Sequence, residues 1–117
     1  MAESDTEPIR SSLLRLLDLI GDFEAQRAYE QDVPIANVPA ELVCMWFDDA
    51  YHPDSEQHAK AFSARERKLL ERFHMAYEKC ADDLPCDNGV AVLQQSSQWI
   101  AVSQEAAKTA GEIRDAS

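Results

Sequence analysis

The chain has 117 residues, of which 45% are hydrophobic and 28% charged, and its formal net charge is −11. This length suits one small domain with a single core, and the apolar content is typical of a folded protein. No apolar run is long enough to span a membrane, and the acidic N-terminus lacks the apolar segment of a secretory signal. We therefore expect residues 7–117 to form one folded domain and residues 1–6 to be a disordered polar leader.

The acidic residues are concentrated in the first half of the chain. Residues 1–60 contain thirteen Asp and Glu but only four Lys and Arg. A field of this sign repels nucleic acid and attracts basic partners. The three cysteines form no C-x-x-C pair, which favours free thiols in a reducing compartment. We therefore expect a cytoplasmic protein that makes no direct contact with nucleic acid or membrane.

The first predicted element is a helix over residues 7–30. Its apolar residues recur at the 4-3-4-3 spacing of an amphipathic helix: Ile9, Leu13, Leu16, Ile20 and Phe23. Thr6 can cap this helix, and Pro8 fits its first turn. Gly21 costs a helix about 1 kcal/mol relative to Ala, so we expect it to mark a close helix crossing.

Prolines define the elements in the middle of the chain. Pro34 and Pro39 predict a loop over residues 32–39, and Pro39 suits the first turn of a second helix capped at position 37 or 38. The apolar run 42–47 belongs to this helix, because no other segment offers it a strand partner. Pro53 ends the helix, and a short third helix capped at position 54 or 55 reaches about residue 62.

The Ser63-Ala-Arg-Glu66 sequence is a capping box and predicts the start of a fourth helix. The apolar stripe of this helix is Leu69, Phe73, Ala76 and Cys80, broadened by Leu70 and Tyr77. A turn over residues 84–89 precedes a last helix over about residues 90–113. The apolar residues of this last helix that can pack are Leu93, Trp99, Ile100, Val102, Ala106, Ala110 and Ile113. The sequence thus predicts an all-α bundle of four main helices plus one short helix.

An acidic segment follows the apolar run and is the first candidate binding site. Its predicted partner-binding residues are Asp48, Asp49, Tyr51, His52, Asp54 and Glu56. Asp48 and Asp49 fall in the predicted last turn of a helix, where each acid costs some tenths of a kcal/mol up to about 1. Such a local penalty is expected at functional positions. Tyr51 and His52 would add aromatic contact area. The alternative is that one acid caps the next turn and the other is merely solvated.

Two further hypotheses concern acidic residues. A second partner-binding group is predicted on the first helix and the loop after it: Asp22, Glu24, Tyr29, Glu30 and Asp32. The acids between Asp48 and His58, with His52 and His58, could also offer metal ligands. This stretch lacks the glycine of an EF-hand and every Cys/His zinc spacing. We therefore predict no metal and no cofactor, with a metal-binding helical protein as the alternative.

The motifs of catalysis are missing from the sequence. It contains no G-x-S-x-G and no phosphate-binding loop, and its three glycines leave little scope for cradling a cofactor phosphate. We expect His74 to lie at the edge of the core and Trp46 and Trp99 within it. A basic strip over residues 65–72 is expected to be neutralised by Glu66 and Glu71 at helical spacing. The chain is therefore predicted not to be an enzyme.

Three stretches carry a resemblance to a known family. They are Val-Pro-Ala-Glu-Leu-Val at 38–43, Trp-Phe-Asp-Asp-Ala-Tyr-His-Pro at 46–53, and Ala-Phe-Ser-Ala-Arg-Glu at 61–66, followed by Leu70 and Phe73. Over residues 20–105 the chain resembles small immunity proteins of bacterial polymorphic-toxin and contact-dependent growth-inhibition systems. The resemblance implies a cytosolic inhibitor that covers the active site of a cognate toxin domain, often a nuclease. A helical regulatory adaptor, whose partner would dock in an apolar groove, is a further alternative.

Overall fold

The computed structural model describes the backbone of residues 2–116 and the side chains of residues 7–115. Within this part every regular element is a helix, which confirms the predicted all-α class. The α-helices are α1 (Ala2–Ile20), α2 (Phe23–Asp32), α3 (Val38–Cys44), α4 (Glu56–Ala61), α5 (Ala64–Glu78), α6 (Gly89–Leu93) and α7 (Ser97–Ala116). A π-helix, η1 (Met45–Ala50), continues α3, and a 3₁₀ turn, η2 (Ala81–Asp83), follows α5. None of the described helices combines the length and apolar character that crossing a membrane requires.

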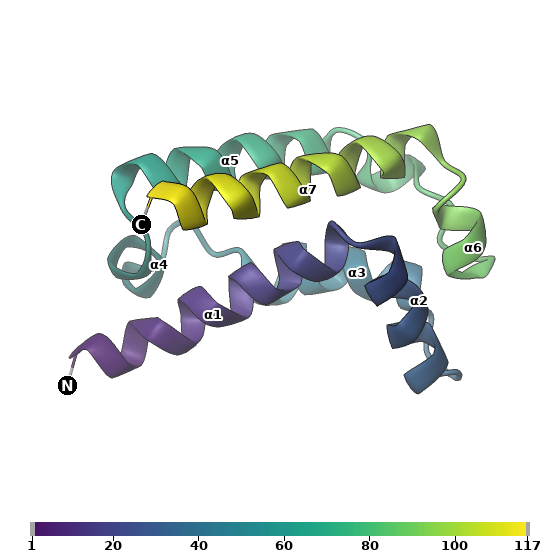
Figure 1. Ribbon diagram of the computed structural model, residues 1–117, viewed down its shortest axis with the longest axis horizontal. Coiled ribbons are helices and arrows are strands. Elements are labelled where there is room, and N and C mark those ends of the chain that lie inside the picture. The colour runs from purple at the N-terminus through teal and green to yellow at the C-terminus, as the bar shows by residue number, and fades with distance from the viewer. Residues whose placement is uncertain (1, 117) are drawn as a thin grey trace.

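The helices form two layers (Figure 1). In one layer α5 and α7 lie side by side and antiparallel, and in the other α1 lies against η1, the continuation of α3. The short helix α4 closes one end of the molecule, and α2 and α6 lie at the other end. The core between the layers is rich in large aromatic side chains, including Trp46, Phe73, Tyr77 and Trp99, which are all fully buried. The predicted core positions of both tryptophans are thus confirmed.

The first predicted helix is broken at residues 21 and 22, so a single helix over residues 7–30 is wrong. Asp22 caps the new helix α2, because its side chain accepts a hydrogen bond from the Ala25 amide at 3.1 Å. The buried Gln26 amide donates to the carbonyls of Leu19 and Ile20, at 3.1 and 2.8 Å. These carbonyls lie at the C-terminal end of α1, where helical partners run out. A buried side chain therefore stabilises the break.

The last predicted helix is also broken, at residues 94–96, into α6 and α7. Gln94 donates to the Gln26 side-chain oxygen at 3.1 Å and to the Phe23 carbonyl at 3.0 Å. The same Gln26 oxygen accepts a hydrogen bond from the Trp99 indole at 3.0 Å. The two breaks thus meet in one buried polar network. The count of four main helices plus one short helix is wrong because two predicted helices each divide, which gives seven α-helices among the described residues.

Two details of the predicted helix faces are resolved. A Cβ atom on Gly21 would lie 2.9 Å from the Ala107 nitrogen, which confirms that Gly21 marks a close crossing, here with α7. On α5 the fully buried residues are Leu70, Phe73 and Tyr77, all within the predicted stripe, whereas Leu69 and Ala76 are only partly buried. The predicted stripe is therefore confirmed. On α7, Ile100 is exposed, and its predicted role in packing is wrong.

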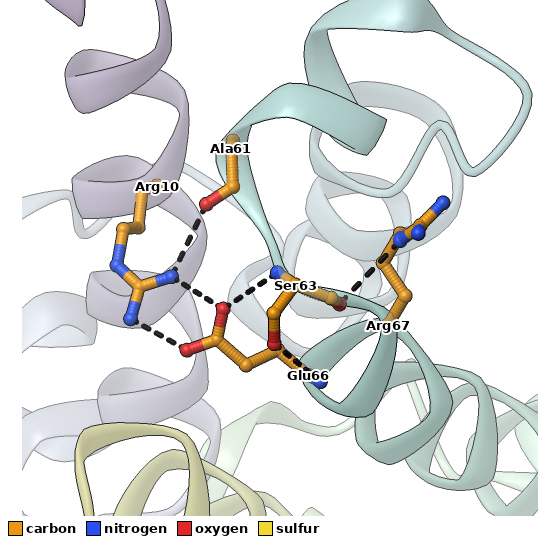
Figure 2. Close-up of polar contacts among 5 residues, drawn as sticks. All are labelled: Arg10, Ala61, Ser63, Glu66 and Arg67. Carbon is orange, nitrogen blue, oxygen red and sulfur yellow. Dashed lines mark hydrogen bonds and ion pairs between the residues drawn. The ribbon is translucent and has the colours of Figure 1, made fainter. Parts of the chain in front are cut away.

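The capping box at Ser63 and Glu66 is confirmed, and Arg10 extends it (Figure 2). The Ser63 hydroxyl accepts from the Glu66 amide at 3.1 Å, and the Ser63 amide donates to Glu66 Oε1 at 2.8 Å. The Arg10 guanidinium donates to both carboxylate oxygens of Glu66, at 2.9 and 2.8 Å, and to the Ala61 carbonyl at 3.1 Å. This contact fastens α1 to the corner between α4 and α5.

Because Glu66 is buried and paired with Arg10, it does not neutralise the basic residues beside it on α5. The predicted neutralisation of the strip by Glu66 is therefore wrong. One of the strip's bases, Arg72, pairs instead with Glu112 on α7 at 2.6 Å. The Arg10 guanidinium lowers the pKa of Glu66 below its ordinary value, since it stabilises the charged carboxylate.

Candidate protein-binding surface

The candidate surface begins on the π-helix η1, which turns the end of the apolar run toward the core. The Tyr51 amide donates to the Trp46 carbonyl at 3.1 Å, a bond that spans five residues. This register places residues five apart above one another, and the Trp46 and Tyr51 rings stack with centroids 4.9 Å apart. The Trp46 indole also donates to His74 Nδ1 at 3.1 Å. The segment before the acids is therefore fixed by aromatic packing and a hydrogen bond.

Tyr51 has a different role from the predicted one. Its side chain is only 6% exposed and lies stacked against both Trp46 and His74, the latter at a centroid distance of 4.7 Å. Burial raises the pKa of the Tyr51 phenol, and the Glu71 and Asp54 carboxylates act in the same direction. The expectation that Tyr51 supplies exposed contact area is therefore wrong. It supports the acidic segment from the core.

The other predicted residues of this segment are exposed: Asp48, Asp49, His52, Asp54 and Glu56. Asp48 and Asp49 lie on η1, His52 and Asp54 in the turn after it, and Glu56 at the start of α4. Local hydrogen bonds hold this turn. The Ser55 hydroxyl donates to the His52 carbonyl at 3.0 Å and accepts from the His58 amide at 3.1 Å, so that Ser55 caps α4. His52 Nε2 lies 3.1 Å from the Asp49 carbonyl. The carboxylates thus lie on two helical elements and on the hydrogen-bonded turn that joins them.

Asp48 and Asp49 face different hollows, although they are adjacent in the sequence. Asp48 lines a groove of about 290 Å³ between η1 and the end of α5, together with Glu78 and Asp82. Asp49 lines a hollow of about 240 Å³ against α1, beside Pro8. The start of the predicted acidic patch therefore separates two hollows. We call residues 48–56 the acidic ridge.

Glu78 and Asp82 were not among the predicted site residues. They lie about thirty residues further along the chain, and no motif or spacing links them to Asp48. Their carboxylates join it because the end of α5 and the turn η2 pack beside η1. Contacts of this kind depend on the tertiary fold, so the sequence alone gave no signal for them.

The second predicted group is divided between structural and exposed residues. Asp22 caps α2, the Tyr29 hydroxyl donates to Glu41 at 3.1 Å, and a Glu30 oxygen accepts from the Val90 amide at 2.8 Å. These three side chains already have partners inside the fold. Glu24 and Asp32 are exposed. The group therefore offers fewer carboxylates to a partner than the acidic ridge does.

The structure does not assemble the metal ligands considered above. No group of three or more His, Cys, Asp or Glu side chains is placed to hold a metal ion among the described residues. His58 is buried, and its ring packs edge-on against Tyr51 and beside Phe62. Burial lowers the pKa of His58, and the nearby Arg67 and His52 act in the same direction. His58 is thus part of the aromatic core beneath the ridge.

His74 lies at the edge of the core, as predicted. Its Nδ1 accepts a hydrogen bond from the Trp46 indole, so in the neutral ring the N–H is on Nε2. This Nε2 lies 3.4 Å from a Glu78 carboxylate oxygen. His74 thereby connects the buried aromatic cluster to the wall of the groove.

Comparison of the chain with family models, curated proteins and solved structures found no match.

Proposed function

We propose that this chain is an acidic protein inhibitor of the immunity type, which binds a basic toxin domain and covers its active site. The observation that carries the proposal is the acidic ridge, in which exposed carboxylates lie on both sides of the buried Tyr51 and follow the buried Trp46. In such a complex the inhibitor would act in the cytoplasm, where the toxin meets its target.

Charge supports a basic partner. The ridge carries Asp48, Asp49, Asp54 and Glu56, and it contains no Lys or Arg. A nuclease binds the phosphate backbone of its substrate with a positively charged surface. An acidic ridge complements such a surface and speeds encounter with it. A basic nuclease domain is therefore the partner class that this electrostatic pattern fits best.

Rigidity supports the same function. An inhibitor gains affinity when its contact residues need no ordering on binding, because less conformational entropy is lost. The stacked rings of Trp46, Tyr51 and His74 hold η1, and Ser55 holds the turn after it. The ridge thus has the fixed shape that tight inhibitors present to their targets.

The test is to purify the chain with the basic toxin domain encoded beside its gene and to measure complex formation and toxin activity. We expect a one-to-one complex, loss of toxin activity, and an association rate that falls as salt screens the charges. Absence of a complex at low ionic strength would contradict the proposal. If the association rate did not change with salt concentration, the acidic ridge would not be what attracts the partner.

A further inference from the structure

The groove beside the acidic ridge combines an apolar floor with an acidic rim. Val43, Phe47 and Ala81 contribute the apolar surface. Asp48 on η1, Glu78 at the end of α5 and Asp82 on η2 contribute carboxylates from its two sides. All three acids are exposed, and none of the residues that line the groove is basic. Lys79, next to Glu78, lines two other hollows, one of which Glu78 also lines.

The floor and the rim are held in place by the aromatic cluster. The Phe47 ring lies between His74 and Tyr77, at centroid distances of 5.3 and 4.9 Å. Tyr77 is fully buried behind it, and its hydroxyl has no hydrogen-bond partner. Glu78 extends past His74 Nε2 at 3.4 Å, and its side chain is 68% exposed. The groove therefore presents a packed aromatic surface beside solvent-exposed carboxylates.

We propose that this groove receives an arginine side chain of the partner, a statement that rests on the proposed function and names the contact it would use. An arginine has an apolar stem that can lie along Val43 and Ala81, and a charged head that remains near water. Its planar guanidinium is weakly hydrated, stacks on aromatic faces and pairs with carboxylates in two directions. Phe47 and the three acids match each of these properties.

A lysine fits the same groove less well. Its ammonium is a compact and strongly hydrated charge, which gains less from an aromatic floor. An apolar side chain would bury the floor but would leave Asp48, Glu78 and Asp82 without a partner charge. The occupant that satisfies both floor and rim is thus arginine.

The experiment uses the isotopically labelled full chain and three short peptides that differ at one position. The probes are acetyl-Leu-Arg-Leu-amide and its counterparts with citrulline or lysine in place of arginine. Citrulline has the shape of arginine without its charge. We expect the arginine peptide to shift the amide resonances of Phe47, Asp48, Glu78 and Asp82, the lysine peptide to do so more weakly, and the citrulline peptide to leave them unchanged.

Two matched variants place the binding site. Asp48→Asn, Glu78→Gln and Asp82→Asn together neutralise the rim, and we expect affinity for the arginine peptide to fall about fivefold to tenfold, as for a few exposed ion pairs. The control variant combines Asp49→Asn, Asp54→Asn and Glu56→Gln, which remove the same number of charges outside the groove. We expect the arginine peptide to shift the groove resonances of this variant as it does those of the parent. Equal shifts from all three peptides, or an unchanged response of the neutralised rim, would overturn the proposal.

The failure of this proposal can be separated from failure of the proposed function. If the chain inhibits a basic toxin and the neutralised rim inhibits it equally well, the groove assignment is wrong and the inhibitor function stands. If the arginine peptide binds in the groove but no basic toxin domain forms a complex, the groove assignment stands and the inhibitor function is wrong.

Discussion

Gly21 lies where the end of α1 crosses α7, and the space for a side chain is missing there. A Cβ on this residue would lie 2.9 Å from the backbone nitrogen of Ala107 and 3.1 Å from its Cβ. Backbone cannot move aside as a flexible side chain can, so the two helices would have to separate. The residue therefore sets how closely the two layers approach.

Replacing Gly21 with Ala should lower the free energy of unfolding by about 1–3 kcal/mol, the range typical of overpacked sites. The control is Gly111→Ala on α7, where nothing lies within 4 Å of the added atom. That variant should gain up to about 1 kcal/mol from helix propensity. Urea denaturation of both variants checks this pair. A Gly21→Ala protein as stable as the Gly111→Ala protein would show that the crossing is loose.

Glu66 links stability to pH through its pair with Arg10. Its pKa in the folded state lies below the ordinary value of 4.5, so the folded protein releases this proton more readily than the unfolded chain. The stabilisation is therefore complete above about pH 4.5 and is lost as the pH falls through the lowered folded value.

We expect Glu66→Gln to lower the free energy of unfolding by about 1.5–3 kcal/mol at pH 7, as for loss of hydrogen bonds to a charged group. In acid the difference between variant and parent should shrink, because the parent carboxylate becomes protonated. Denaturation at pH 7 and at pH 3 measures both values. A difference that stays constant between these two pH values would assign the stabilisation to packing rather than to charge.

At the scale of elements, η1 is held by the aromatic rings that lie beneath it. The Tyr51 ring is buried and packs against both Trp46 and His74, so removing it leaves a cavity. Tyr51→Ala should cost about 3–5 kcal/mol of stability, the range found for large aromatic truncations. Tyr51→Phe keeps the stacked ring and should stay within about 1 kcal/mol of the parent.

Thermal and urea unfolding of the two Tyr51 variants test this role, and binding to the toxin domain adds a second measurement. Tyr51→Phe should bind the toxin domain as the parent does, because the hydroxyl is not part of an exposed contact. If the Tyr51→Phe protein has normal stability but binds the toxin domain more weakly, the Tyr51 hydroxyl contacts the partner and the structural role assigned to it is wrong.

The limits of prediction also lie at the scale of elements. The capping box at Ser63 and the cap at Asn37 were predictable because they rest on residues within one turn. The break after α1 carried a local signal too, since Gly21 and Asp22 are a helix stop followed by a cap. What stabilises that break is Gln26, whose partners lie on other helices, and no local pattern reports such a network.

Some features of the candidate site could likewise be predicted from the sequence, and others depend on tertiary packing. The exposed carboxylates of the acidic ridge could be predicted from an acidic run that follows a buried one. The burial of Tyr51 could not, because it depends on the five-residue register of η1 and on His74 from α5. Glu78 and Asp82 join the groove through packing between distant segments.

At the scale of the whole molecule, the two predicted acidic groups occupy separate regions. The acidic ridge follows η1, whereas Glu24 and Asp32 lie on α2, which Figure 1 places at the end of the molecule away from α4. If a basic partner is attracted by net charge alone, charge reversal in either region should weaken its binding equally. If the partner docks on the acidic ridge, only charge reversal in the ridge should weaken binding strongly. This difference separates specific binding from general attraction.

The most direct test of the account compares two charge reversals of equal size in cells that express the toxin domain. Asp48→Lys with Asp49→Lys should abolish protection and slow association by about tenfold or more, since the ridge would repel its partner. Glu24→Lys with Asp32→Lys should protect as the parent does. All four side chains are exposed, so both proteins should fold. Full protection by the ridge variant, or loss of protection by the α2 variant alone, would contradict the account.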